Sequence, residues 1–243
     1  SMEYPRGTDG SYKDKPLRLL VQLNFEKLPH IEDFPRQGIL QIFLACENDC
    51  LYGFDFNSAD EQTDQNGFRV IYHKDIITDT SLLISDDDIP CDSFSSDEYD
   101  FPLKKEFILC AEEPDKCPAT PNDYRFSNAL VSSYSEIMGQ EVSNYWNIDG
   151  YDTLYDRCPE SVAFIGGYPR FTQSDPREDC PSLEGFDRVL FELGSLQGEE
   201  ITSWGGHDFD IIWGDVGTGV FLIPAEKLRA CDFSEVVYNY DCG

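Results

Sequence analysis

Residues 19–23 have the sequence Leu19-Leu20-Val21-Gln22-Leu23, and residues 189–193 have the sequence Val189-Leu190-Phe191-Glu192-Leu193. Each stretch is short and apolar and places one Gln or Glu between the same apolar positions, a pattern that predicts a β-strand. A Tyr-Pro-Arg triplet precedes each one, at residues 4–6 and 168–170, and a glycine-led apolar strand follows each one, at residues 38–44 and 219–223. This order of features indicates an internal repeat. Chance recurrence of short β-patterns is the alternative.

The rest of the chain also reads mainly as short strands bounded by Gly, Pro, Asn or Asp, which fold as antiparallel sheets. The expected strands cover residues 17–24, 38–45, 51–56, 68–73, 107–111, 161–165, 188–193, 209–213, 219–223 and 236–240. One central helix is expected, with Asn122 or Asp123 as its cap and Gly139 as its stop. A short helix is expected at residues 225–229, and a long exposed loop at 75–102.

These elements predict an α+β fold of mostly antiparallel β-structure with one central helix. Two pseudo-repeated β-rich halves, at about residues 3–115 and 160–243, are expected to pack as one body. A helical segment at residues 120–158 joins them, so residues 1–243 form a single domain. The length of 243 residues is sufficient for a sizeable core.

The charge is strongly acidic. Lys plus Arg number 18 and Asp plus Glu 47, and 18 − 47 gives −29. Such a field repels phosphate backbones and anionic lipid surfaces, so we expect neither nucleic acid nor membrane as a partner. Nine acids and no base lie between Lys74 and Lys104. Such stretches are either solvated loops that keep the protein soluble or a docking face for a basic protein.

The termini and cysteines bear on the cellular compartment. Ser1-Met2 resembles a remnant of tag cleavage before a methionine, and no secretory leader is expected after it. No apolar run reaches the about 20 residues of a bilayer crossing. Nine cysteines are an odd number, and none form a Cys-x-x-Cys pair. We therefore expect mostly buried, reduced thiols and a cytoplasmic location; the alternatives are a disulfide-bonded secreted protein and a scattered metal site.

A first group of candidate ligand-binding residues surrounds the second Tyr-Pro-Arg triplet, at residues 168–170, and includes Tyr168. Gly166 and Gly167 precede Tyr168, and their backbone N–H groups could receive an anion, although a turn with positive φ is the simpler interpretation. Gln173, Asp175 and Arg177 are two residues apart, and this spacing would place all three on one face of an extended segment. Asp175 and Arg177 would then orient a ligand, or simply form a local ion pair.

A second group lies near the carboxyl-terminal strands, where Trp204, Trp213 and Asp215 bring aromatic and acidic side chains together. Carbohydrate or peptide grooves have this composition. A hydrolase acting through paired carboxylates among Asp175, Asp208, Asp210 and Asp215 is therefore the alternative function. Neither a metal site nor a cofactor is expected. Weak calcium binding fits the acidic composition, although residues 55–61 fail the EF-hand pattern.

Several motifs follow one another along the chain: Pro16-Leu17, residues 19–25, Leu28-Pro29, Phe34-Pro35, residues 38–43, Tyr52-Gly53, residues 68–73, residues 166–173, Asp175-Pro176-Arg177, Trp213-Gly214-Asp215, Gly217, Phe221, Ile223, Asp232-Phe233-Ser234 and Asp241-Cys242. In this order, the motifs make the sequence resemble the YwqG-like family, a bacterial domain family of unknown function. The resemblance covers about residues 14–242. It implies an α+β body with an internal duplication, and it implies no established activity, catalytic residue or cofactor.

The sequence departs from that family at its start, because other members carry a Gly-Gly and a further segment before the first Tyr-Pro motif. By analogy, the family is similar to small acidic proteins that act as immunity factors against bacterial toxins. Together with the charge, the sequence favours a non-enzymatic binding protein with a basic protein partner.

Overall fold

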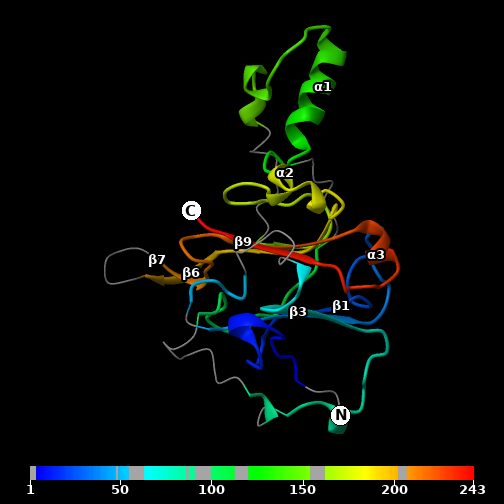
Figure 1. The fold of residues 1–243 in the computed structure, drawn as a ribbon, viewed down its shortest axis with the longest axis vertical. Coiled ribbons are helices and arrows are strands. Elements are labelled where there is room, and N and C mark those ends of the chain that lie inside the picture. The colour runs from blue at the N-terminus through cyan, green and yellow to red at the C-terminus, as the bar shows by residue number, and fades with distance from the viewer. Residues whose placement is uncertain are drawn as a thin grey trace.

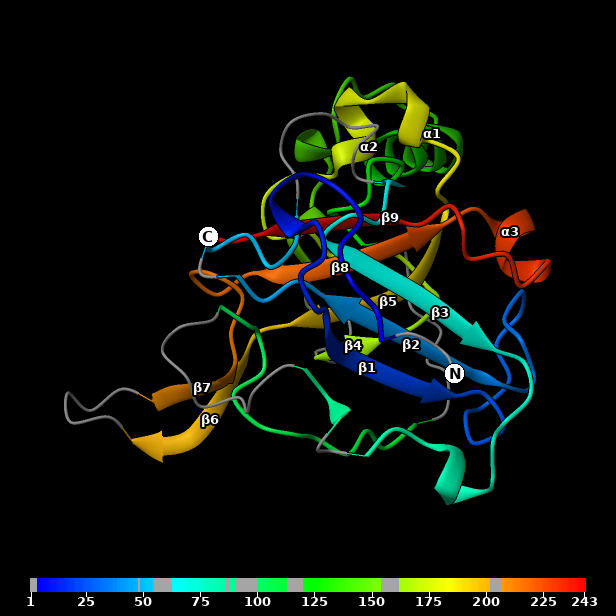
Figure 2. The same ribbon diagram turned by 60° about the horizontal axis from the view of Figure 1, so that its bottom comes forward.

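The computed structural model describes residues 4–47, 49–54, 63–85, 88–90, 100–112, 120–153, 162–201 and 207–243 of the chain. Two antiparallel sheets face each other, as Figures 1 and 2 show. The three-stranded sheet has the order β1-β2-β3, from β1 (Arg18–Asn24), β2 (Ile39–Leu44) and β3 (Phe68–His73). The four-stranded sheet has the order β4-β5-β8-β9, from β4 (Ala163–Phe164), β5 (Arg188–Gly194), β8 (Thr218–Ile223) and β9 (Val237–Asp241). β6 (Leu196–Ile201) and β7 (His207–Ile211) form a separate ribbon.

The helices are few and mostly short. They are α1 (Phe126–Met138), α2 (Pro176–Asp179) and α3 (Ala225–Arg229), with 3-10 turns η1 (Gly10–Tyr12), η3 (Thr80–Leu82), η5 (Tyr145–Asn147) and η7 (Pro181–Leu183). α1 ends at Gly139, whose φ of 65° is readily adopted only by glycine. The predicted α+β class dominated by antiparallel β-structure is therefore confirmed, as are the central helix with its stop at Gly139 and the short helix at 225–229. The predicted cap at Asn122 or Asp123 is wrong, because α1 begins at Phe126 with Arg125 in the N-cap position. The Asp123 carboxylate is bound to Arg125 and Arg177 and does not cap the helix.

The core lies between the two sheets and is rich in aromatic side chains. Phe221 of β8 stacks on Tyr238 of β9, with ring centroids 4.7 Å apart and planes at 10°. Phe68 of β3 reaches the same tyrosine from the opposite sheet, at 5.3 Å. Contacts of this kind join both sheets in one apolar cluster. The sheets therefore stabilise each other by burying their facing surfaces.

A polar contact also joins the sheets, at the loop between β1 and β2. The carboxylate of Asp33 accepts hydrogen bonds from Arg188 of β5 and Arg229 of α3, each at 2.9 Å. The hydrogen bonds from Arg229 and Arg188 lower the pKa of Asp33 below its usual value of 3.8. Because both arginines remain partly exposed, this contact orients the loop more than it stabilises the fold.

The outer face of the four-stranded sheet is covered as well. Val220 and Leu222 of β8 pack there beneath Phe171, Leu183 and Phe186, which come from the segment before β5. β5 and β8 are therefore buried on both faces. A polar side chain in either strand must find a partner inside the protein.

The two strands that suggested the repeat share an irregularity. The register of β1 against β2 shifts between Leu19 and Val21, and that of β5 against β8 shifts between Val189 and Phe191. These are corresponding positions in the two matched stretches. The internal repeat, its two halves and the single domain nevertheless stay predictions.

Several local predictions are wrong. Residues 51–54 form a turn in place of the start of a strand, and residues 107–111 have no regular structure. β6 was not expected, because Gly198 and the acids after it weaken its strand pattern. Residues 55 and 56 lie outside the described residues.

The prediction of mostly buried thiols is also wrong for the part of the chain that the structure describes. Of the free cysteines there, Cys46 is buried, whereas Cys50, Cys110 and Cys231 are exposed. The positions of Cys91, Cys117 and Cys158 lie outside the described residues. Across the described ranges, no helix has both the length and the apolar character that a bilayer crossing requires.

We predict that Phe221→Ala lowers the free energy of unfolding by about 3–5 kcal/mol, because it opens a cavity where the two sheets meet. Urea denaturation measures this change. Leu82→Ala removes a side chain that is 69% exposed and should cost no more than about 0.5 kcal/mol. Equal effects of the two substitutions would contradict a core shared by the sheets.

Candidate functional site

The first group of candidate residues lies in a strap, residues 166–177, that crosses the outer face of the four-stranded sheet. It begins where the N–H of Gly166 donates to the Val189 carbonyl of β5, at 2.8 Å. Gly166 and Gly167 have φ values of 71° and 72°, as a turn requires. A Cβ on Gly166 would lie 3.3 Å from Ile31 of the opposite sheet's loop. The two glycines therefore let the strap begin with a tight turn where the side chain of Ile31 leaves little space.

Glu192 of β5 lies beneath the strap and is 1% exposed. The backbone N–H and the Nε of Arg170 both donate to its carboxylate, at 2.9 and 3.1 Å. Burial raises the pKa of Glu192 from 4.5 to about 8; Arg170 opposes this shift, and Asp241 adds to it. The guanidinium of Arg170 also lies over the ring of Phe164, 4.5 Å from its centroid. A carboxyl group that changes protonation near neutral pH therefore sits under the strap.

Asp241 at the end of β9 holds the next part of the strap. Its two carboxylate oxygens accept the backbone N–H groups of Thr172 and Gln173, at 3.1 and 2.8 Å. Burial raises the pKa of Asp241, and these hydrogen bonds lower it. The Gln173 side chain donates to the Cys242 carbonyl at 2.6 Å. Two carboxylates of the sheet thus fix the strap through its backbone.

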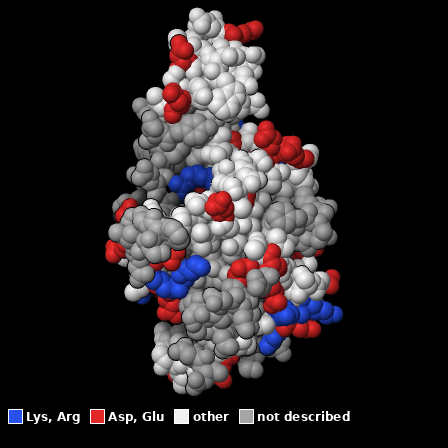
Figure 3. Space-filling model, turned by 90° about the vertical axis from the view of Figure 1, so that its left-hand side faces the viewer, with Lys and Arg blue, Asp and Glu red and all other residues white. Residues whose placement is uncertain are grey.

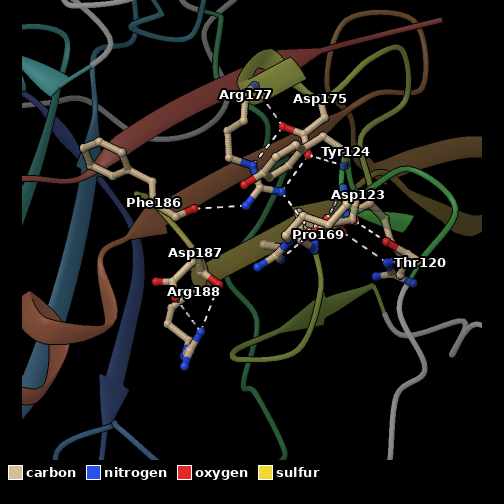
Figure 4. A network of polar contacts seen from close by, with 12 residues as sticks. Thr120, Asp123, Tyr124, Pro169, Asp175, Arg177, Phe186, Asp187 and Arg188 are labelled. Atoms are coloured by element: carbon tan, nitrogen blue, oxygen red, sulfur yellow. Dashed lines mark hydrogen bonds and ion pairs between the residues drawn. The ribbon is translucent and has the colours of Figure 1, made fainter. Parts of the chain in front are cut away.

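The end of the strap contains a fully buried arginine, Arg177, shown in Figure 4. Its Nε and Nη2 donate to the two carboxylate oxygens of Asp175, at 2.9 and 2.6 Å. Nη2 also donates to Asp123 at 3.0 Å, and Nη1 to the Phe186 carbonyl at 3.0 Å. The guanidinium lies 4.8 Å from the ring centroid of Tyr124. The guanidinium thus contacts two carboxylates and a carbonyl, as a buried cation requires.

The same network fixes the segment that leads into α1. Asp123 accepts two hydrogen bonds from the guanidinium of Arg125, at 2.8 and 2.6 Å, and these lower its pKa against the effect of burial. The backbone N–H of Tyr124 donates to Asp175 at 2.9 Å. Thr120 donates to the Pro169 carbonyl at 2.6 Å. Residues 120–125 are therefore bound to the strap along their length.

This arrangement differs from the extended segment that the two-residue spacing suggested. Asp175 is the N-cap of α2, and its Oδ1 accepts the N–H of Arg177 at 2.9 Å. Gln173 points away toward the carboxyl terminus. Asp175 and Arg177 thus form the local ion pair that was the other interpretation, and Gln173 takes no part in it.

A family model for a domain of unknown function, DUF1963, matches residues 1–242. The chain belongs to the DUF1963 family. The comparison with curated proteins finds no match. The strap, with Arg170 and Arg177, therefore lies within the DUF1963 domain. Membership of the YwqG-like family stays a prediction.

Trp213 and Asp215 of the second group take no part in the strap's network of charged side chains in the DUF1963 domain. Trp213 is completely buried on the inner side, where its ring lies 5.4 Å from Tyr52 and 5.8 Å from Tyr240. Its indole N–H has no hydrogen-bond partner. Asp215 is exposed in the following turn, and its carbonyl accepts the N–H of Gly243. Trp204 lies outside the described residues.

Tyr168 lies at the strap's surface, where the Arg125 guanidinium sits 5.4 Å from its ring centroid. No group of three or more His, Cys, Asp or Glu side chains suited to a metal occurs among the described residues. Residues 55–61, which fail the EF-hand pattern, lie outside the described residues. Weak calcium binding therefore stays a prediction.

Sequence reasoning missed Glu192, Asp241, Arg170 and Asp123 as members of this site. One signal was available for Glu192, because it interrupts a strand whose neighbours Phe191 and Leu193 are apolar. A carboxylate in such a strand indicates a buried partner when both faces of the sheet are covered. The local sequence pattern did not show that residues 171–186 cover the outer face of the sheet.

We predict that Arg177→Met lowers the free energy of unfolding by about 3–5 kcal/mol, because it leaves Asp123 and Asp175 buried without their shared cation. Lys105→Met is the control, since Lys105 is 57% exposed in its ion pair with Asp210 and should cost less than about 1 kcal/mol. Chemical denaturation measures both. A loss for Arg177→Met as small as that for Lys105→Met would show that the network contributes little.

A second prediction concerns the pH dependence of stability. Because the pKa of Glu192 is raised from 4.5 to about 8, the folded chain binds this proton more tightly than the unfolded chain. The resulting stabilisation is complete below pH 4.5 and is lost as pH rises through 8. Glu192→Gln should therefore flatten the fall in urea midpoint between about pH 5 and pH 9.

Glu47→Gln is the control for this measurement, because Glu47 forms a surface ion pair with Lys15. It should keep the slope of the unsubstituted chain. An unchanged slope in Glu192→Gln would mean that the buried carboxyl group does not titrate in this range.

Proposed function

We propose that this DUF1963 protein is a non-enzymatic binding protein whose partner is a basic protein. The net charge of −29 carries the proposal, since charge of one sign accelerates and orients association with the opposite sign. One specific version of this proposal is an immunity-like protein that binds a cationic toxin in a bacterial cytoplasm. The YwqG-like resemblance supports this form by analogy.

The use of the basic side chains supports the same proposal. In the part of the chain that the structure describes, eight Lys and Arg residues form ion pairs with acids of the same chain: Lys15, Lys105, Arg125, Arg170, Arg177, Arg188, Lys227 and Arg229. Internal partners thus neutralise many of the few cations, and a large excess of carboxylates stays outside these pairs. Figure 3 shows acidic side chains at many places on one face, with basic side chains gathered in a few patches beside them. Such a surface favours a cationic partner.

The strap supports binding over catalysis, because its charged groups are already occupied. The Arg177 guanidinium contacts two carboxylates and a carbonyl, and Glu192 and Asp241 each accept two hydrogen bonds from the strap. Groups held in this way position backbone. In this proposal the strap therefore has a structural role, since its charged groups hold it against the four-stranded sheet.

A hydrolase is the second candidate function, and one observation favours it. Glu192 has a raised pKa beside Asp241, whose pKa is also raised, and pairs of perturbed carboxyl groups are typical of active sites. Of the acids expected from sequence, Asp175 is bound to Arg177 and Asp210 to Lys105, and Asp208 and Asp215 are exposed. Hydrolysis of a peptide or glycan that Glu192→Gln abolishes without unfolding the chain would favour this candidate.

The binding proposal predicts that the immobilised full chain retains a protein of high isoelectric point at low salt and releases it at high salt. Screening shortens the range of charge attraction from about 10 Å at 0.1 M to about 3 Å at 1 M salt. Mass spectrometry identifies the retained protein, and sedimentation with the purified partner confirms the complex. A retained set with no basic protein, or binding that salt leaves unchanged, would contradict the proposal.

A further inference from the structure

The lobe formed by residues 126–153 projects from the sheets. It contains α1 and η5 and lies beyond α2 at one end of the molecule, as Figures 1 and 3 show. The buried network around Arg177 holds the residues immediately before it. The lobe is therefore attached to the body through the residues before α1 and extends away from the sheets.

The lobe buries little of its own apolar surface. All of residues 126–153 are described, and the buried side chains among them are Phe126 and Ile148. α1 has 13 residues, and helices of about 12–15 residues are marginal in water without packing. A helix in this position would be stabilised by a further contact surface.

One face of α1 is apolar along its whole length. Phe126, Leu130, Tyr134 and Ile137 follow each other at helical spacing, with Met138 beside the last of them. The start of this stripe is covered, since Phe126 contacts Tyr145 with ring centroids 5.9 Å apart. Its end is uncovered, and Ile137 and Met138 are 80% and 56% exposed. The last turn of α1 thus presents an apolar surface to solvent.

A cluster of three aromatic rings adds a second uncovered surface. Trp146 lies 4.2 Å from Tyr145 and 5.0 Å from Tyr151 between ring centroids, and its plane is at 84° to that of Tyr151. These neighbours hold the indole in place, and Trp146 is nevertheless 55% exposed. A fixed, exposed indole is a good acceptor for a Lys or Arg cation and a frequent anchor of protein interfaces.

The charge of the lobe restricts what can cover these surfaces. Residues 126–153 contain the acids Glu136, Glu141, Asp149 and Asp152 and no Lys or Arg. A second copy of this chain would bring like charges together, in addition to its overall −29, and an anionic membrane would be repelled. A partner with both apolar and basic side chains complements the lobe.

We propose that the lobe is the docking surface for a basic amphipathic helix of a partner protein. Trp146 stacks against a Lys or Arg of that helix, and Ile137 and Met138 pack against its apolar side. Trp146 adjoins Tyr145, which contacts Phe126 at the start of α1, and Ile137 lies in the last turn of the same helix. α1 is about 20 Å long at 1.5 Å per residue, and a partner helix of similar length spans from one to the other. This assignment rests on the proposed function, since it supplies the place at which the basic partner binds.

The test uses the full chain and a fluorescent synthetic peptide of Leu, Lys and Ala, about 18 residues long and patterned as an amphipathic helix. The lobe variant is Ile137→Ser/Met138→Ser/Trp146→Ser. The matched control is Leu82→Ser/Leu83→Ser, which changes exposed aliphatic side chains of η3 and the residue after it, far from the lobe in Figure 1. None of these substitutions alters the net charge. Fluorescence anisotropy gives the Kd.

We expect the lobe variant to weaken peptide binding at least about 10-fold and the control to change it less than about twofold. Trp146→Tyr should retain most of the affinity, because it keeps an aromatic ring. Thermal unfolding of the variants should match that of the unsubstituted chain, since the changed side chains are exposed.

Different results would overturn the assignment in distinguishable ways. Equal losses in the two variants, or no loss in either, with binding that is still salt-sensitive, would show that the basic partner binds elsewhere while the proposed function stands. Absence of peptide binding at low salt would contradict both. A chain that sediments as a dimer, together with a monomeric lobe variant, would make the lobe an interface between copies.

Discussion

The buried guanidinium of Arg177 fixes the relation between three parts of the chain. A cation without solvent exposure is tolerated only if carboxylates and carbonyls surround it, so Asp123, Asp175 and the Phe186 carbonyl must all be in place together. Asp123 and Arg177 are 54 residues apart in sequence. The ion pair therefore joins the start of α1, the strap and the approach to β5. The hydrogen bonds of Thr120 and Tyr124 to the strap add to this attachment of the segment before the lobe.

The double coverage of the four-stranded sheet explains the rest of the strap. Once apolar side chains cover both faces of β5 and β8, Glu192 has no water to bind and must be partnered from within. The strap supplies these partners through backbone N–H groups as well as Arg170. Backbone donors require a particular path of the chain, which the two positive-φ glycines permit. The buried carboxylates and the turn are thus parts of one constraint.

This division of charge connects the fold with the proposed function. Eight basic side chains among the described residues are paired with acids of the same chain, in the strap and in surface pairs, whereas the acids of the sequence far outnumber its bases. The body then supplies a rigid support and a long-range field. The lobe adds exposed apolar and aromatic side chains, which provide the short-range contacts that an electrostatic field alone cannot.

The sequence by itself determined those features that depend on near neighbours. The apolar runs marked β3 with its observed bounds, Gly139 marked the end of α1, and Gly166 and Gly167 marked a turn with positive φ. The tertiary structure alone decided which side chains meet across long separations. The contact of Thr120 with Pro169 spans 49 residues, and the partner of Glu192 lies on a segment whose path no local pattern describes. Strand and turn preferences are properties of a few adjacent residues, whereas the burial of a carboxylate depends on what folds over it.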